Sequence, residues 1–258
     1  MKAVILAAGY ATRLYPLTLD RPKALLPVGG RPMVEHLLLQ LQGVEGLDAI
    51  YLVTNSKFAG SFREWVAGWD GHEVQIVDDG TGDEESKLGA IGDLDLTIRT
   101  AAIDDDLLVL AGDNLFSESL APFAEFGRAK RAPALGVYDV GDLEAIRRYN
   151  AIELDDEGRL TYFEEKPEQP RSTLTGIALY FYPRDSLVLV GEYLEAGNNP
   201  DQPGRLVEWL YPRVPVYAWL VPGRWYDIGS AETLAEADRA FSTGDSLAHN
   251  RHRGVRDT

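Results

Sequence analysis

Residues 1–13 read Met-Lys-Ala-Val-Ile-Leu-Ala-Ala-Gly-Tyr-Ala-Thr-Arg, and residues 21–30 continue the stretch with Arg-Pro-Lys-Ala-Leu-Leu-Pro-Val-Gly-Gly. The apolar run at residues 3–8 is too short for a globular helix and suits a strand buried on both faces. Its small terminal residues would let a ligand approach the backbone, whose amides can bind phosphate oxygens. Arg13 and Lys23 add two cations. The stretch predicts a parallel α/β sheet with a phosphate site, although a strand, a turn and two surface cations would also account for it.

The composition limits the classes to which the chain can belong. Its 258 residues suffice for one α/β domain or a domain with a small lobe. There is no cysteine, so disulfides and thiolate metal sites are excluded. The net charge of −16 argues against nucleic acid or an anionic membrane as a partner. No signal peptide or long apolar span is visible, which predicts a cytoplasmic protein.

Apolar runs alternate with helical patterns along most of the chain, which is typical of a mostly parallel sheet with helices on both faces. Strands are predicted at residues 49–54, 74–77, 107–111, 133–140, 174–182 and 214–221, and a hairpin at 151–154 and 160–164. Helices are predicted after Pro32, from a cap at Ser56, around residues 120–126, after Leu88-Gly89 and at 231–241. Residues 197–204 are predicted to be a long connection. One domain over residues 1–241 and a flexible tail over 242–258 follow from this pattern.

Two motifs in the opening stretch resemble a family signature. Residues 6–18 (Leu-Ala-Ala-Gly-Tyr-Ala-Thr-Arg-Leu-Tyr-Pro-Leu-Thr) and 21–33 (Arg-Pro-Lys-Ala-Leu-Leu-Pro-Val-Gly-Gly-Arg-Pro-Met) are similar to that of the sugar-1-phosphate nucleotidyltransferases, such as the glucose-1-phosphate thymidylyltransferases. The usual Gly-x-Gly before Thr-Arg is Gly9-Tyr10-Ala11 here. Because alanine enters positive φ less readily than glycine, the loop is expected to differ slightly or to keep a negative φ at Ala11.

The resemblance implies a Rossmann-like, mostly parallel mixed sheet flanked by helices, with a small β-rich sugar-binding lobe. It implies transfer of a nucleoside monophosphate from a triphosphate, with dTTP or UTP favoured, to a sugar-1-phosphate such as glucose-1-phosphate. The products are a nucleoside-diphosphate sugar and pyrophosphate. Arg13, Lys23 and Lys166 are the implied catalytic cations.

Mg²⁺ is the cofactor that the resemblance implies, with Asp113 and Asp227 as its ligands. Asp113 follows a buried strand in Leu-Ala-Gly-Asp-Asn, where α/β folds place ligand-binding residues. Asp227 lies in a Trp-x-Asp-x-Gly pattern. Mg²⁺ needs one or two carboxylates besides phosphates and waters. Without the resemblance, either aspartate could be an ordinary turn residue.

The resemblance also implies two sets of binding residues. The nucleotide set is Leu6, Ala7, Ala8, Gly9, Ala11, Thr12, Leu88, Gly89 and Gly112, and the sugar-phosphate set is Asn150, Glu165, Lys166, Thr175, Gly176 and Trp225. Read alone, the Glu165-Lys166-Pro167 motif is a strand end with solvated charges. Asn150 stands where relatives usually carry glycine, and the acidic loop at residues 79–93 departs from their Gln-Pro-rich loop. The sequence therefore leaves the sugar and the base open.

Two other functions stay open at this point. The donor could be CTP and the acceptor a choline or inositol phosphate, although choline would call for an aromatic cage. Alternatively, the chain could be a non-catalytic regulator that binds nucleotide sugars, against which the retention of the five charged residues argues. The four histidines are expected to be structural or surface residues, since a largely dianionic sugar phosphate needs no general base. A homo-oligomer stays open as well.

Overall fold

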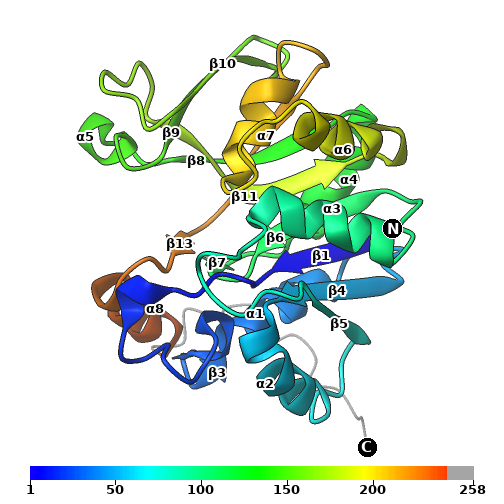
Figure 1. Cartoon of the computed structure of the whole chain (residues 1–258). Helices are drawn as coiled ribbons and strands as arrows, with labels where there is room; N and C mark the ends of the chain where they lie inside the picture. Colours follow the sequence, from blue (N-terminus) through cyan, green and yellow to red (C-terminus); the bar gives the residue numbers. More distant parts are fainter. Residues whose placement is uncertain (243–258) are drawn as a thin grey trace, which may run out of the picture.

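A seven-stranded mixed sheet forms the centre of the computed structural model, which describes residues 1–242 (Figure 1). In spatial order its strands are β12 (Tyr217–Leu220), β8 (Ala134–Asp139), β11 (Leu174–Tyr182), β6 (Leu107–Ala111), β1 (Lys2–Leu6), β4 (Ala49–Thr54) and β5 (Val74–Asp78). β1 pairs in parallel with β4 and β6, whereas β11 is antiparallel to both β6 and β8. The carboxyl ends of β1, β4, β5 and β6 therefore meet at one edge. The predicted mostly parallel mixed sheet is confirmed.

Helices cover both faces of the sheet. One face carries α1 (Met33–Leu41), α2 (Ser56–Val66) and α4 (Ala121–Lys130), and the other carries α3 (Ala90–Thr100), α6 (Val188–Glu195) and α7 (Pro203–Leu210). Within β1, Ala3 and Ile5 pack into the core under the first face and Val4 into the core under the second. This burial on both sides explains why the strand reads as an unbroken apolar run.

Three small elements with two strands each complete the β structure. They are β2 (Pro27–Val28) with β3 (Arg31–Pro32), β7 (Asn114–Phe116) with β13 (Trp225–Asp227), and β9 (Asn150–Leu154) with β10 (Leu160–Glu165). The antiparallel β9–β10 pair confirms the predicted hairpin and, with the short α5 (Leu143–Ile146), projects from the main sheet (Figure 1). This projection is the small β-rich lobe.

A third apolar cluster joins the opening stretch to the end of the described chain. Leu14 and Val28 from that stretch pack with Leu115 of β7, Ile228 after β13 and Ala237 of α8 (Ala231–Ser242). The Gly29 amide also donates a hydrogen bond to Asp238 Oδ1 at 2.9 Å. The C-terminal helix thus holds the segment that follows Lys23. Of the predicted tail at residues 242–258, Ser242 belongs to α8, and residues 243–258 lie outside the described residues.

Several predicted boundaries need correction. Asn55, rather than Ser56, caps α2, because its side-chain oxygen accepts a hydrogen bond from the Phe58 amide at 3.1 Å. The predicted connection at residues 197–204 is shorter, since Pro203 begins α7. The predicted late strand at 214–221 is reduced to β12. Proline is tolerated in the first turn of a helix, where its missing N–H is not needed.

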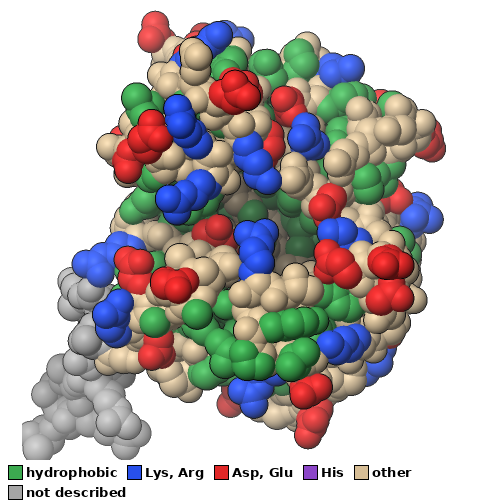
Figure 2. Space-filling view, turned by 60° about the vertical axis from the view of Figure 1, so that its left-hand side comes forward, with side chains coloured by type: hydrophobic (Ala, Val, Ile, Leu, Met, Phe, Trp, Pro, Cys, Tyr) green, Lys and Arg blue, Asp and Glu red, His purple; other side chains and the backbone are tan. Residues whose placement is uncertain are grey.

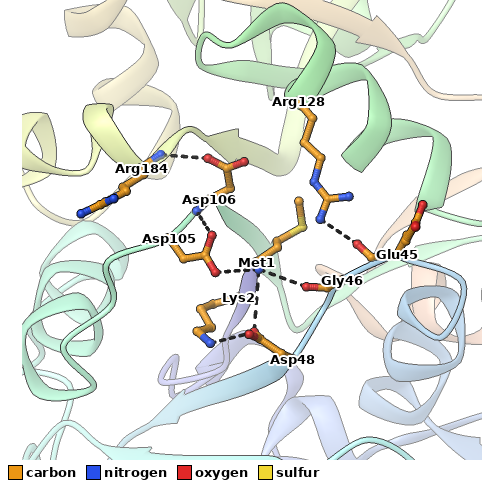
Figure 3. Close-up of polar contacts among 9 residues, drawn as sticks. All are labelled: Met1, Lys2, Glu45, Gly46, Asp48, Asp105, Asp106, Arg128 and Arg184. Carbon is orange, nitrogen blue, oxygen red and sulfur yellow. Dashed lines mark hydrogen bonds and ion pairs between the residues drawn. The ribbon is translucent and has the colours of Figure 1, made fainter.

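Charged contacts fix the amino end of β1 (Figure 3). The α-amino group of Met1 donates hydrogen bonds to Asp105 at 2.7 Å and to the carbonyl of Gly46 at 3.0 Å. The Lys2 ammonium pairs with Asp48 at 2.7 Å. Since Asp48 precedes β4 and Asp105 precedes β6, these contacts support the register of the three central strands. None of the helices in the described part of the chain has the length and apolar character that a membrane crossing requires.

Candidate functional site

A cavity of about 480 Å³ opens at the carboxyl ends of β1 and β6. The face that carries these strand ends is hollowed at its centre, and Lys, Arg, Asp and Glu side chains surround the hollow (Figure 2). Of the sequence-predicted residues, the cavity is lined by Leu6, Ala7, Ala8, Gly9, Ala11, Thr12, Arg13, Lys23, Gly89, Gly112, Asp113 and Asp227. Leu88, Asn150, Glu165, Lys166, Thr175, Gly176 and Trp225 are not part of this lining.

Small residues bring the backbones of β1 and β6 close together below the cavity. The Gly112 amide donates to the Leu6 carbonyl at 2.8 Å. A Cβ at Gly112 would lie 3.1 Å from the Leu6 carbonyl oxygen and 3.2 Å from Ala7 Cβ. A larger side chain at Ala7, or any side chain at Gly112, would therefore intrude on this contact or on the cavity. The floor can be approached closely only because these residues are small.

Ala11 adopts the left-handed backbone conformation, with φ of 49° and ψ of 43°. The expectation of a negative φ is thus wrong, and the loop adopts a glycine-like backbone conformation with an alanine. Two hydrogen bonds to the Ala11 carbonyl hold the conformation, one from the Leu14 amide at 2.9 Å and one from the Thr18 hydroxyl at 2.8 Å. The left-handed conformation costs a residue with a Cβ about 1–2 kcal/mol.

Replacing Ala11 by glycine is expected to raise the free energy of unfolding by about 0.5–1 kcal/mol. The relief of the left-handed strain exceeds the extra backbone entropy of glycine in the unfolded chain. Thermal unfolding should show the gain as a Tm higher by about 1–4 °C. Ala8→Gly, in the same loop but at a residue without positive φ, should lower Tm instead. A lower Tm for both variants would show that the left-handed conformation does not strain Ala11.

Asp113 and Asp227 are brought together by the pairing of β7 with β13. Asp227 lies opposite Asn114 in this pair, and the Ile228 amide donates to the Asp113 carbonyl at 3.1 Å. Trp225 Nε1 donates to Asn114 Oδ1 at 2.6 Å, and Asn114 Nδ2 donates to Asp113 Oδ1 at 2.9 Å. Trp225 is therefore linked to Asp113 through Asn114.

The charges at this end of the cavity compensate one another in part. Lys23 Nζ lies 2.6 Å from Asp113 Oδ2. The pKa of the Asp227 carboxyl is raised, first by burial and then by the negative charge of Asp113, while Lys23 and Arg13 act in the opposite direction. Two carboxylates that disfavour each other's charge favour a shared cation.

The donor set fits a magnesium ion. In the described part of the chain, no group of three or more His, Asp and Glu residues gathers around a possible metal position. Asp113 and Asp227 would supply two carboxylates to an ion held between them, and phosphates and waters would complete its shell. This is the usual arrangement for Mg²⁺, whereas structural Zn²⁺ and Ca²⁺ sites draw more ligands from the protein.

Most of the sugar-phosphate candidates lie in the small lobe and on β11, whereas Trp225 lies on β13. Lys166 is exposed, has a φ of 50°, and its amide donates to the Tyr149 carbonyl at 2.7 Å. Burial raises the pKa of the Glu165 carboxyl, although the positive charges of Lys166 and Arg205 oppose the shift. A half-buried carboxyl beside two cations is suited to form hydrogen bonds with the hydroxyl groups of a ligand.

The Asn150 side chain is bonded to the backbone of β11. Its Oδ1 accepts from the Gly176 amide at 2.6 Å and from the Thr175 hydroxyl at 3.2 Å, and its Nδ2 donates to the Gly176 carbonyl at 2.9 Å. The amide thus bridges β9 to β11 near the register shift between Gly176 and Tyr180. This gives Asn150 a structural role in addition to the predicted contact with the sugar.

Replacing Asn150 by alanine is expected to destabilise the protein by about 2 kcal/mol, because the half-buried Gly176 N–H loses the Asn150 side chain and the Gly176 C=O keeps only the 3.4 Å bond from the Thr175 hydroxyl as a side-chain contact. Urea unfolding, followed by far-UV circular dichroism, measures the loss. Gln42→Ala, at an exposed position after α1, should stay within about 0.5 kcal/mol of the parent. Equal losses in both variants would show that the bridge to β11 adds nothing.

The loop at residues 79–89 forms another wall of the cavity. Gly89 precedes α3 with a φ of 81°, and a Cβ there would lie 2.7 Å from the Pro200 carbonyl oxygen. Tyr10 and Thr81 hydroxyls lie 3.3 Å apart in a buried contact between the opening loop and this one. Four further lining residues, Glu84, Lys87, Ala90 and Asp93, belong to the 79–93 loop, which the sequence offered as the candidate for contact with the base. Sequence reasoning missed the other lining residues, namely Tyr10, Leu14, Ala24, Ala111, Asn114, Ala178, Asp201, Pro203 and Gly229.

The chain has recognisable relatives. A family model described as nucleotidyl transferase matches residues 2–244. Over 239 residues the chain is 27% identical to the bifunctional protein GlmU of Methanocaldococcus jannaschii, covering 93% of this chain and 54% of that protein, so it spans about half of that relative's length. Over 182 residues it is 32% identical to the UTP–glucose-1-phosphate uridylyltransferase AglF of Haloferax volcanii, covering 70% of this chain and 72% of that protein.

A solved structure shows the same fold. The structure of a UDP-glucose pyrophosphorylase complexed with UDP-glucose superposes with a TM-score of 0.79 at 21% identity, covering 94% of this chain and 98% of that one. At this identity the likeness concerns the fold alone. The match of the family model to most of the chain, together with AglF, settles the family, and this chain belongs to the nucleotidyl transferases.

Proposed function

We propose that the chain transfers a nucleoside monophosphate from a nucleoside triphosphate, with UTP or dTTP favoured, to a sugar-1-phosphate such as glucose-1-phosphate. An oxygen of the sugar phosphate attacks the α-phosphorus in line, the new P–O bond forms, and the bond to pyrophosphate breaks. The observation that carries the proposal is the meeting of Arg13, Lys23, Asp113 and Asp227 around a cavity floored by small residues.

The cations of the chain have separate tasks in this reaction. Arg13 binds the triphosphate and stabilises the leaving pyrophosphate with its fixed fork of donors. Lys23 neutralises charge at the α-phosphate, which requires its ammonium to exchange Asp113 for a phosphate oxygen. Lys166 and Glu165 in the small lobe bind the phosphate and hydroxyl groups of the sugar. The nucleophile is already anionic, so no side chain has to remove a proton.

Asp113 and Asp227 would hold Mg²⁺. The bound ion supplies charge neutralisation and alignment for the phosphate groups. Asn114 steadies Asp113 through its 2.9 Å hydrogen bond, and Trp225 fixes Asn114 in turn. Asp113 lies just before β7 and Asp227 on β13, far apart in sequence, so their spacing depends on the β7–β13 pair.

A matrix of substrates tests the proposal. Each of UTP, dTTP, GTP, CTP and ATP is combined with glucose-1-phosphate, mannose-1-phosphate, phosphocholine and inositol phosphate, with and without Mg²⁺, and pyrophosphate release is measured. We expect release with a sugar-1-phosphate and a uridine or thymidine triphosphate, in the presence of Mg²⁺. Turnover with CTP and phosphocholine alone would identify a cytidylyltransferase. Tight nucleotide-sugar binding without any turnover would identify a regulatory protein.

A further inference from the structure

Each carboxylate oxygen of Asp113 already has a partner from the described part of the chain. Asn114 Nδ2 donates to Oδ1 at 2.9 Å, and Lys23 Nζ lies 2.6 Å from Oδ2. Because Trp225 holds Asn114 in turn, Lys23 is the partner that can leave. Oδ2 has a second lone pair, but an ion bound there would lie within a few ångströms of the ammonium, and like charges repel. A cation that binds Asp113 therefore has to displace Lys23.

The backbone that carries Lys23 is fixed in the fold. The hydrogen bond from the Leu26 amide to the Lys23 carbonyl, at 2.9 Å, closes a tight turn over residues Lys23–Leu25. Ala24 packs into the core under α1, and Leu26 packs into the cluster that contains α8. The Met33 amide also donates to the Leu26 carbonyl at 3.1 Å. Only the side chain of Lys23 is therefore free to change its partner.

The positive charge of Lys23 also acts on Asp227. Burial raises the pKa of the Asp227 carboxyl and the charge of Asp113 raises it further, whereas Lys23, followed by Arg13, lowers it. One ammonium thus compensates both carboxylates, as a bound cation would. Lys23 and a Mg²⁺ ion consequently compete for the same pair of aspartates.

A triphosphate offers Lys23 another partner. Arg13 lines the same cavity and forms no ion pair with any residue between 1 and 242, so its guanidinium is available to phosphate oxygens. A triphosphate bound by Arg13 places further phosphate oxygens in the cavity, and the three N–H donors of the ammonium can turn toward them. Oδ2 of Asp113 is then released for a cation. The departure of Lys23 and the binding of the metal are therefore linked.

We propose that Lys23 keeps Mg²⁺ away from Asp113 and Asp227 until a nucleoside triphosphate binds, because its ammonium takes the position of the ion and the phosphates draw it off. The inference rests on the proposed function, since it takes the two aspartates as Mg²⁺ ligands and a triphosphate as the ligand that releases Lys23. It gives Lys23 a second task besides neutralising charge at the α-phosphate. Because linkage is reciprocal, Mg²⁺ also strengthens the binding of the triphosphate by the same factor.

Metal binding without nucleotide is the direct test. Electron paramagnetic resonance measures free Mn²⁺, an ion that shares the preference of Mg²⁺ for carboxylate oxygens, during a titration with protein, and added Mg²⁺ then displaces it. Mildly alkaline pH keeps both aspartates ionised. We expect Lys23→Met, which removes the charge but keeps an unbranched side chain, to bind Mn²⁺ at least about 10-fold more tightly than the parent. Loss of a proposed catalytic cation should thus improve metal binding while it lowers pyrophosphate release.

Three further variants assign the gain to this site. Lys23→Arg keeps the positive charge and should bind Mn²⁺ within about 3-fold of the parent. Lys23→Met combined with Asp227→Asn lacks one carboxylate and should lose the gain. Lys2→Met is the matched control, because Lys2 lies at the other end of β1 and pairs with Asp48 at 2.7 Å on the surface. It should change Mn²⁺ binding by less than about 2-fold.

Thermal unfolding gives a second readout and shows whether each variant is folded. Mg²⁺ alone should raise the Tm of Lys23→Met and leave that of the parent unchanged, because a ligand stabilises only a folded state that binds it. Lys23→Gln replaces Lys23→Met if the latter does not fold. The role of Lys23 is overturned if the uncharged variant binds Mn²⁺ no more tightly than the parent, if Lys23→Arg gains as much, or if the double variant keeps the gain.

These results are distinct from a failure of the proposed function. If Lys23→Met gains the Mn²⁺ site but the parent releases no pyrophosphate with any pair of substrates, the transferase proposal fails and the role of Lys23 in excluding the metal stands. If the parent releases pyrophosphate with Mg²⁺ and Lys23→Met gains no affinity for Mn²⁺, that role fails and the transferase proposal stands.

Discussion

Replacing Asp113 by alanine is expected to lower kcat by at least about 100-fold, the usual effect of removing one placed electrostatic group from a transition state. The change removes a ligand from the proposed Mg²⁺ site and the partner of Lys23, whose ammonium lies 2.6 Å from Asp113 Oδ2. Steady-state pyrophosphate release at saturating Mg²⁺ and substrates measures the loss. We expect the loss in kcat, because the negative charge that a Mg²⁺ ion held by Asp113 would neutralise grows as the α-phosphorus is attacked.

A control beyond the opposite end of β6 separates this effect from a general loss of structure. Asp104 precedes the amino end of β6 and forms an exposed ion pair with Arg184 at 2.6 Å, far from the carboxyl end that carries Asp113. Asp104→Ala should keep kcat within about 2-fold, because exposed ion pairs contribute little. Near-normal turnover of a folded Asp113→Ala variant would show that Asp113 is not a ligand of the metal.

Replacing Asp93 by asparagine is expected to stabilise the protein at neutral pH by about 2–4 kcal/mol. In the unfolded chain the carboxyl titrates near its ordinary value of 3.8, whereas in the folded protein its pKa is raised to about 8. The stability that the protonated form provides is complete below about pH 4 and is lost as the pH rises through about 8. An amide does not ionise, so it retains this stability.

Thermal unfolding at several pH values measures the difference. The Tm of Asp93→Asn minus that of the parent should be small near pH 4 and should grow to about 5–10 °C at pH 8. Asp95→Asn, on the same helix with an exposed ion pair to Arg99, should show no such growth. Parallel Tm curves for Asp93→Asn and the parent would mean that Asp93 is ionised in the folded state.

The sequence was sufficient to predict those parts of the fold in which burial determines the pattern of apolar residues. Residues 3–8 and 107–111 read as strands because both faces of β1 and β6 are covered by helices, so that no polar position interrupts them. The family signature at residues 6–33 likewise rests on local residues. Its implied metal pair, Asp113 and Asp227, does come together in the structure.

Other features could not be predicted because tertiary contacts create them. β7 and β13 have three residues each, too few for a periodicity, and exist because each strand pairs with the other. Asn150 read as a sugar contact, but its bonds to Gly176 become visible only when β9 lies beside β11. Asp93 looked like one more acid in a charged loop, and its burial beside Asp79 is what distinguishes it.

The pairing of β7 with β13 also determines when the protein becomes competent during its synthesis. A ribosome that has released residues 1–223 has provided Arg13, Lys23 and Asp113, but neither Asp227 nor the partner strand of β7. The cluster that holds the segment after Lys23 further requires Ile228 and Ala237. Contacts between such distant residues form late, since a long loop must close first. Nascent chains that lack residues 224–237 therefore hold part of the proposed phosphate site without the second aspartate, and the proposed activity would arise in one step once those residues have been released.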